Sequence, residues 1–181
     1  MKTFFLQGDN MPAFLRNIFL IPAIALLVLP TLQSHAEENA TAHVDEAKLD
    51  GLKCFIMVKK DVKGKKTLEY KDGTLYLCCS SCVKRIQKKP EKYEANSNRQ
   101  LVYLGQYKQT LCPLTGNEIT KDSPEFKVDG GVTGVVNVHV ASDGEVTKLG
   151  EMDLEAQIEA LFGQEGFAKG KFVVVKATPE K

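Results

Sequence analysis

The first hydrophobic feature of the chain is an uninterrupted apolar run from Ile18 to Leu29. Lys2 and Arg16 precede this run, and the polar stretch "TLQSHAEENA" follows soon after it. A basic segment, an apolar core and then small residues are typical of a secretory signal peptide. We therefore predict a signal peptide over residues 1–36, with cleavage after Ala36.

A membrane anchor is the alternative interpretation of the same run. A helix that spans a bilayer needs roughly 20 apolar residues, and this run is shorter. Met11 also heads a more ordinary signal sequence than Met1 does. We expect an exported protein, periplasmic or secreted, with no membrane contact after cleavage.

Residues 37–50 contain little apolar surface and several acids, which predicts a flexible or weakly helical lead-in. Regular structure is expected from about Leu52. In "TLEYKDGTLYLCC", Asp72-Gly73 separates two runs rich in Thr, Tyr and Leu. Asp-Gly in this setting favours a β-hairpin, because both turn positions prefer positive φ. The second strand of this hairpin runs into the cysteines.

A helix is expected directly after the cysteines. Ser80 or Ser81 can cap it, and Val83 and Ile86 give it an apolar side until Pro90 interrupts it. The segment "PEKYEANS" is then predicted to form a further turn. Unpaired N–H groups and the positive end of the dipole gather at a helix start, so cysteines there are favoured as thiolates.

The second half of the chain repeats this pattern in part. Cys112 aligns with Cys54, "PEFKVDGG" aligns with "TLEYKDG", and "VVNVHV" aligns with the strand that leads into the cysteines. This similarity predicts two copies of one small unit. Where the first copy has its cysteines, the second has valines, Asn137 and His139. We expect these positions to serve packing, with His139 a packed or surface residue rather than a ligand.

The predicted fold class is α+β, with two tandem hairpin-plus-helix modules. The first covers residues 51–97, and the second, degenerate module covers residues 98–181. Other elements expected in the second module are a strand at 101–104 before a turn at Gly105, an amphipathic helix and an added strand at 172–175. The helix is matched to the one that follows the cysteines, and Asp153 can cap it. Its apolar side consists of Leu154, Ile158, Leu161 and Phe162.

Charge is balanced over the whole chain, with a formal net charge of +1, but it is distributed unevenly. The segment from Lys53 to Lys92 has 12 Lys or Arg against 4 Asp or Glu, whereas Pro113 to Lys181 has 7 against 12. One interpretation is a solvated lysine-rich face. The other is a positive surface that favours thiolate forms of the cysteines.

Three of the five cysteines lie within "YLCCSSC", and this cluster allows three interpretations. Disulfides suit an exported protein, but the number of cysteines is odd and a ring between adjacent Cys78 and Cys79 would be strained. Cys79 and Cys82 form a C-x-x-C motif before a helix, as in redox enzymes, although no βαβ pattern surrounds it. A metal site is the third and preferred interpretation.

Soft thiolates suit Zn²⁺, Cu⁺ and related ions. Cys54 from a loop, with Cys78 and Cys82 from a strand end and a helix start, can form a metal-binding knuckle. Cys79 is the fourth candidate ligand and the least certain, because side chains of neighbouring strand residues point to opposite faces. Bound metal would also supply folding free energy to a module with a thin core.

The segments "KCFIMVKKDV" and "TLEYKDGTLYLCCSSCVKRIQKKPEKY" resemble the YHS and TRASH group of small metal-binding domains. The similarity extends to exported YHS-like proteins that continue into "NRQLV" and "CPLTG", as this chain does. The resemblance implies a treble-clef-like ββα module that binds a heavy metal such as copper or zinc. It also implies that Cys54, Cys78 and Cys82 are ligands, and that Cys79 occupies a position where other members have a small polar residue.

The sequence contains no Ser-His-Asp constellation, phosphate-binding glycine loop or paired carboxylates in a recognisable setting. We therefore expect a binding protein rather than an enzyme, one that captures, buffers or hands over one soft metal ion, zinc or copper. Its partners would be the ion and a metal-handling protein, with no role for nucleic acid. The alternatives are a structural or interaction module with oxidised cysteines and a C-x-x-C thiol-disulfide oxidoreductase.

Overall fold

The computed structural model describes residues 42–62, 66–131 and 133–177, all within one compact unit, Glu38–Lys181. The predicted signal peptide and its cleavage position lie outside the described residues. The unit combines helices with three two-stranded antiparallel sheets, which confirms the α+β class. Over the described part of the chain, no helix is long and apolar enough to cross a membrane. A short 3₁₀ helix, η1 (Glu46–Leu49), lies in the segment predicted to be flexible or weakly helical.

The predicted hairpin is present, with β1 (Lys66–Tyr70) antiparallel to β2 (Gly73–Leu77). Its turn is shifted by one residue from the predicted position. Lys71 and Asp72 form the turn, and Lys71 rather than Gly73 adopts a positive φ, of 54°. The prediction of an Asp72-Gly73 turn was therefore wrong in register.

Gly73 has a different role, as the first residue of β2. A Cβ atom at this position would lie 2.8 Å from both Gln106 Oε1 and Leu101 Cδ2. The glycine therefore permits close packing of the hairpin against α2 (Pro90–Tyr103) and against the segment that follows this helix.

Helix α1 (Ser80–Lys88) begins directly after the hairpin, as predicted. Its N-cap is Cys79, not Ser80 or Ser81, because Cys79 is the last residue with extended backbone angles (φ −162°, ψ 162°). The helix buries Cys82 in its first turn and Ile86 one turn later. The chain therefore changes from strand to helix within the cysteine cluster itself.

Helix α2 differs most from the sequence prediction. Pro90 does not end the helical region but begins a second helix of 14 residues, because proline at the first helical position needs no N–H partner. The predicted turn "PEKYEANS" lies in this helix, and the predicted strand at 101–104 covers its last three residues and its C-cap, Leu104, so both predictions were wrong. A short apolar run does not distinguish a strand from a buried helical segment. The helix also runs across residues 97 and 98, where the sequence suggested a module boundary.

The second half supplies the remaining elements. The helix predicted around Ile158 is confirmed, and Asp153 Oδ1 caps it by accepting a hydrogen bond from the Ala156 N–H at 2.8 Å. The predicted C-terminal strand is confirmed as two residues, β6 (Val173–Val174), paired with β3 (Tyr107–Lys108). Helix α3 was not predicted. The helices and strands that follow α2 are, in chain order, β3 (Tyr107–Lys108), β4 (Glu125–Val128), β5 (Val136–His139), α3 (Asp143–Gly150), α4 (Leu154–Phe162), α5 (Gln164–Lys169) and β6 (Val173–Val174).

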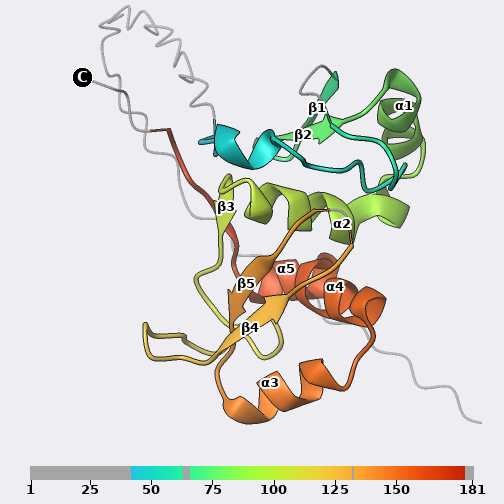
Figure 1. Ribbon diagram of the computed structural model, residues 1–181. Helices are drawn as coiled ribbons and strands as arrows, with labels where there is room; N and C mark the ends of the chain where they lie inside the picture. Colours follow the sequence, from blue (N-terminus) through green and yellow to red (C-terminus); the bar gives the residue numbers. More distant parts are fainter. Residues whose placement is uncertain (1–41, 63–65, 132, 178–181) are drawn as a thin grey trace, which may run out of the picture. The chain divides into compact units, whose positions relative to one another are not determined.

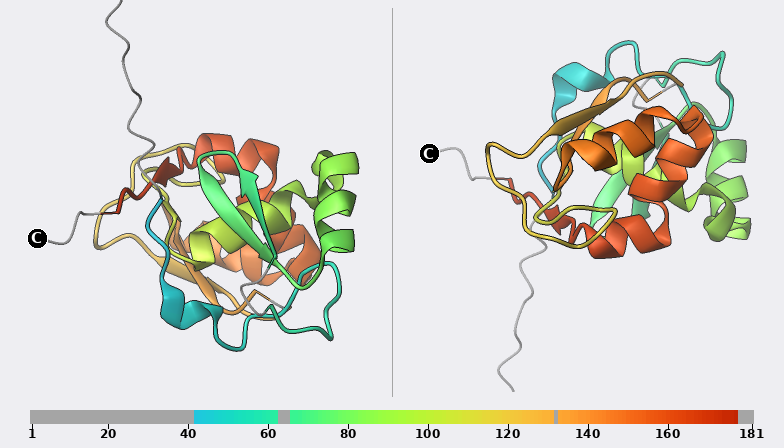
Figure 2. Two further views of the ribbon diagram at one scale, coloured as in Figure 1. Left: turned by 90° about the horizontal axis from the view of Figure 1, so that it is seen from above. Right: turned by 90° about the horizontal axis from the view of Figure 1, so that it is seen from below.

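Within this unit, α2 lies between two groups of elements (Figure 1). The β1–β2 hairpin and α1 lie on one side of α2, and the β4–β5 hairpin with α3, α4 and α5 lies on the other. The left view in Figure 2 shows the first hairpin lying across α2. Buried side chains from both sides, among them Leu75, Leu101 and Leu161, belong to one continuous apolar core. The cysteine-bearing half therefore shares its core with the second half.

Two glutamines close the outer edge of β2. The Gln100 side chain accepts a hydrogen bond from the Tyr76 N–H at 2.8 Å and donates one to the Tyr76 carbonyl at 3.0 Å. Gln106 does the same with the N–H and carbonyl of Thr74, at 2.7 Å each. These side-chain amides take the place of a neighbouring strand, so the edge of the sheet is satisfied without one.

Buried polar side chains also attach α2 to the second half. Arg99, only 1% exposed, donates hydrogen bonds from Nη2 to the carbonyls of Val128, Gly130 and Gly134. These carbonyls belong to the end of β4 and to the loop between β4 and β5. The "NRQLV" segment therefore connects both hairpins to one helix.

The two halves correspond closely where each hairpin meets its helix. Ser142, the N-cap of α3, has φ −156° and ψ 158°, close to the angles of Cys79. The seventh residue of each helix is buried, Ile86 in α1 and Leu149 in α3. Helix α3 therefore resembles α1 at its N-cap and at its seventh residue, whereas the sequence matched α1 with the helix around Ile158.

Candidate metal centre

The structure brings all four predicted cysteines together around the sulfur of Cys82. The Sγ atom of Cys82 lies 3.8 Å from that of Cys54, 3.7 Å from that of Cys78 and 3.5 Å from that of Cys79. The sulfurs of Cys54, Cys78 and Cys82 all lie within 4.8 Å of one another. All five cysteines of the chain fall within the described residues, and all are free thiols.

These separations suit a bound ion. A tetrahedral Zn²⁺ site has Zn–S bonds of about 2.3 Å, which places its sulfurs about 3.8 Å apart. Cys78 and Cys79 both approach Cys82 because β2 ends at Leu77, so the alternation of strand side chains no longer applies to them. The group of three cysteines can hold a metal ion, and Cys79 lies beside it.

Cys54 begins a tight loop that turns backbone donors toward its sulfur. Its own N–H donates to the Lys60 carbonyl at 2.9 Å, which closes the loop. Burial alone would raise the pKa of the Cys54 thiol, but hydrogen bonds from the backbone N–H groups of Cys78, Met57 and Ile56 lower it below the usual value. These N–H groups stabilise a thiolate at Cys54.

The other cysteines differ in their protonation. Burial, followed by the hydrogen bond to Cys54, raises the pKa of Cys78 to about 11. Burial, followed by the hydrogen bonds with Cys79 and Cys78, raises the pKa of Cys82. The backbone N–H of Cys82 lowers the pKa of Cys79, the N-cap residue. At neutral pH the metal-free cluster therefore keeps protons on Cys78 and Cys82.

The cluster is closed on one side and open on the other. Cys54 and Cys82 are 0% and 1% exposed, whereas Cys78 and Cys79 are half-buried. A cavity of about 640 Å³ lies against the two half-buried cysteines. Its lining consists of Met57, Lys59, Lys60, Asp61, Lys66, Leu77, Cys78 and Cys79.

Cys112 and His139 do not belong to this cluster. Cys112 is buried, and its Sγ atom lies 3.5 Å from Glu145 Oε2. His139 Nδ1 lies 3.1 Å from the Ser123 carbonyl, and its backbone N–H and carbonyl both bond to the Gln109 side chain. Among the described residues, Cys54, Cys78 and Cys82 form the only group of three or more His, Cys, Asp or Glu side chains that could hold a metal ion.

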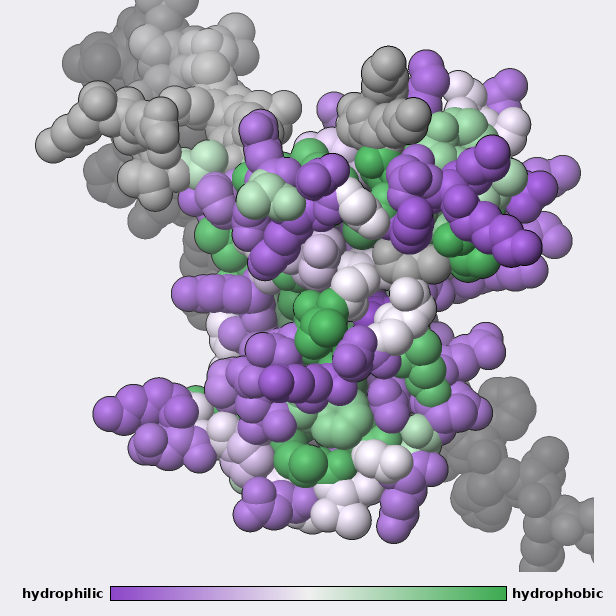
Figure 3. Space-filling view, viewed as in Figure 1, coloured by the Kyte–Doolittle hydropathy of each residue, from purple (hydrophilic) through white to green (hydrophobic). Residues whose placement is uncertain are grey.

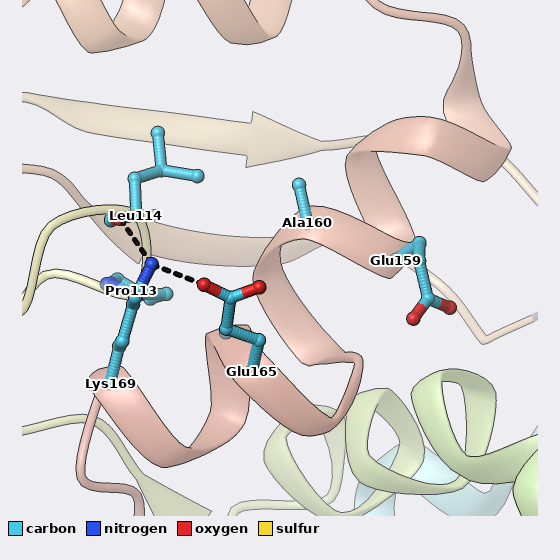
Figure 4. A pocket seen from close by; sticks show the side chains of 7 residues that line it. Pro113, Leu114, Glu159, Ala160, Glu165 and Lys169 are labelled. Atoms are coloured by element: carbon cyan, nitrogen blue, oxygen red, sulfur yellow. Dashed lines mark hydrogen bonds and ion pairs between the residues drawn. The ribbon is translucent and has the colours of Figure 1, made fainter.

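A smaller cavity of about 260 Å³ lies in the second half (Figure 4). Lys169 at its edge bonds to Glu165 at 2.6 Å and to the Leu114 carbonyl at 3.4 Å. Its ammonium group is thus already engaged within the protein, and Figure 4 shows Glu159 on the far side of the cavity from this pair.

Sequence reasoning missed two features of this region. The lysine-lined cavity forms because the loop after Cys54 lies beside the start of β1. The sequence signal for this cavity was "MVKK" within that loop, to which the sequence analysis gave no role. The contact between Cys112 and Glu145 was missed because α3 was not predicted.

Comparisons with known proteins do not assign this chain to a family. No family model matches the chain, and no curated protein or solved structure matches it either.

Proposed function

We propose that this protein is an exported binding protein for one soft metal ion, of the zinc or copper class, and that it captures, buffers or hands over that ion. Cys54, Cys78 and Cys82 are the ligands, with Cys79 as the fourth sulfur. The observation that carries the proposal is the convergence of three sulfurs on Cys82 Sγ at 3.5 to 3.8 Å, the spacing that a tetrahedral thiolate site requires.

The proposed architecture is a YHS/TRASH-like pair of treble-clef-like modules, with the metal site kept only in the first. Each half begins with a cysteine in a closed loop, since the Cys54 N–H donates to the Lys60 carbonyl and the Cys112 N–H to the Asn117 carbonyl, both at 2.9 Å. In each half a hairpin and a capped helix follow. In the second half Glu145 stands where the first has Cys82, which supports loss of the ligand set.

Export and partners are also part of the proposal. Export rests on the signal-like residues 1–36, and it argues against a nucleic-acid partner for the lysines. A protein that only binds and releases an ion needs no catalytic constellation, so we do not propose an enzyme. A metal-handling protein is the expected macromolecular partner.

The test is the metal content of the protein purified without residues 1–36, under reducing conditions, from cells supplied with zinc or copper. We expect about one ion per chain by elemental analysis, and four thiols that resist alkylation until a chelator is added. Native mass spectrometry should show the same ratio. A fully metal-free protein with all of its thiols reactive would contradict the proposal.

A second candidate is an oxidised form, and the observation that favours it is the 3.5 Å separation of the Cys79 and Cys82 sulfurs. The same pair suits either a structural disulfide or a C-x-x-C redox centre. The intact mass separates this candidate from the first, because each disulfide removes two hydrogens and excludes the metal. Reduction of a substrate disulfide by the purified protein would favour the redox form.

A further inference from the structure

The open side of the cysteine cluster points to a second ligand of the same ion. Of the four clustered cysteines, Cys54 and Cys82 are fully buried, and Cys78 and Cys79 line the cavity of about 640 Å³. A metal ion held by the cluster therefore meets the outside through this cavity. Its volume lies in the range of about 300 to 1,000 Å³ that holds small ligands.

The charge of this cavity is positive. Three lysines line it, Lys59, Lys60 and Lys66, and its single carboxylate, Asp61, is paired with Lys53. In the part of the chain that the structure describes, no ion pair engages the ammonium groups of the three lysines. Figure 3 shows other hydrophilic side chains crowded over the nearby α1. Such a field repels a bare cation and attracts an anion.

The donor atoms beside the lysines are soft. Cys78, Cys79 and Met57 line the cavity, and the side chain of each carries a sulfur atom. A ligand that reaches the ion here completes a sulfur-rich coordination sphere, and soft ions favour thiolate for that position. The cavity therefore offers the metal ion beside Cys78 and Cys79 to a thiolate, and the ammonium groups of its three lysines to carboxylates.

We propose that this cavity binds a small thiol bearing carboxylates, which coordinates the same ion as the cluster. This inference rests on the proposed metal-binding function. The incoming thiol loses its proton to solvent, and its sulfur forms a bond to the metal as the Cys79 sulfur leaves. The carboxylates pair with Lys59, Lys60 and Lys66. No atom changes oxidation state, and the ion can leave with the thiol or return to Cys79.

The test uses the metal-loaded protein and two probes, mercaptosuccinate, with one thiol and two carboxylates, and neutral 2-mercaptoethanol. The measured quantity is the concentration of each thiol that half-saturates the ternary complex, or that doubles the rate of ion transfer to a coloured chelator. We compare the ratio of these concentrations between protein variants, so that intrinsic differences between the two thiols cancel.

Three lysines should favour mercaptosuccinate over the neutral thiol. In the triple variant Lys59→Gln, Lys60→Gln, Lys66→Gln, we expect this preference to fall about tenfold, with metal content unchanged. The triple Arg variant at the same positions should keep it. A matched control carries Lys121→Gln, Lys127→Gln and Lys148→Gln, exposed lysines of the second half. Added salt should weaken the preference in the wild type, in the triple Arg variant and in the matched control, but not in the triple Gln variant.

The outcomes separate the inference from the function on which it rests. An equal ratio in the wild type and in the triple Gln variant, both metal-loaded, overturns the inference and leaves metal binding intact. A wild-type protein that holds no metal overturns both. Circular dichroism of the variants confirms that a change in ratio does not come from unfolding.

Discussion

Cys112 Sγ lies 3.5 Å from Glu145 Oε2, in the position where Cys54 faces Cys82 at 3.8 Å in the other half. Glu145 is the third residue of α3, as Cys82 is the third residue of α1. The same carboxylate oxygen accepts hydrogen bonds from the backbone N–H of Ala141 at 2.7 Å and of Ser142 at 3.1 Å. The Glu145 carboxylate thus stabilises the junction between β5 and α3 by binding the backbone on one side and the Cys112 thiol on the other.

The first prediction concerns the central ligand. Cys82→Ser should abolish metal binding, because Cys82 is the residue whose sulfur lies within 3.8 Å of all three others. Serine keeps the size but removes the soft donor. Elemental analysis of the purified variant checks this. Cys112→Ser is the control and should keep about one ion per chain, and full occupancy in Cys82→Ser would show that the ion binds elsewhere.

The second prediction is that metal affinity rises with pH. The pKa of Cys78 is raised to about 11 and that of Cys82 is also raised, so both thiols hold protons in the metal-free protein at pH 7. Both must lose them when metal binds, so binding should release about two protons or more. Affinity should therefore increase from pH 6 to pH 9. Calorimetry in buffers of different ionisation enthalpy measures the protons, and a pH-independent affinity would contradict thiolate ligation.

Local signals in the sequence were sufficient for the existence of the first hairpin and of the helix after the cysteines, but not for the register of the turn or the identity of the N-cap. Each of these depends on turn chemistry, helix capping or spacing over a short stretch. The α-helical state of residues 101–103 was not predictable in this way. It depends on tertiary contacts, in which Gln100 closes the edge of β2 and Arg99 binds the carbonyls of the second hairpin. The missed α3 explains the missed role of Glu145.

The third prediction concerns the edge of β2. Gln100→Ala should leave the Tyr76 N–H and carbonyl without their side-chain partner, so the free energy of unfolding should fall by about 2 kcal/mol. Denaturant unfolding of the metal-free protein measures this loss. Gln87→Ala, at an exposed position of α1, is the matched control and should change stability by less than about 0.5 kcal/mol. Equal effects of the two substitutions would show that the Gln100 bonds add no stability.

The fourth prediction is that metal removal loosens one half of the unit. Amide exchange should accelerate in β1, β2 and α1 when a chelator is added, because the ion connects the loop, the strand end and the helix start. Protection in β4, β5 and α4 should persist. Helix α2 should be affected least at Asn98 and Arg99, which bond to the second half. Equal exchange with and without metal would favour a cluster held by packing or disulfides.

The last prediction tests whether the two halves are built on one plan. The positions of Cys54, Cys78 and Cys82 correspond to Cys112, Ala141 and Glu145, because Ala141 directly precedes the N-cap of α3 and Glu145 is its third residue. The double variant Ala141→Cys, Glu145→Cys would therefore place three sulfurs around a second centre. We expect its metal content to rise from about one to about two ions per chain.

The single variant Ala141→Cys is the control for this design and should stay at about one ion, because the Glu145 carboxylate still occupies the centre. Loss of the Glu145 cap should lower the stability of the metal-free double variant by about 1 kcal/mol, and bound metal should restore it. Thermal unfolding with and without zinc measures both effects. A folded double variant that binds one ion and gains no stability from a second would show that the shared geometry of the helix caps does not extend to the position of Cys112.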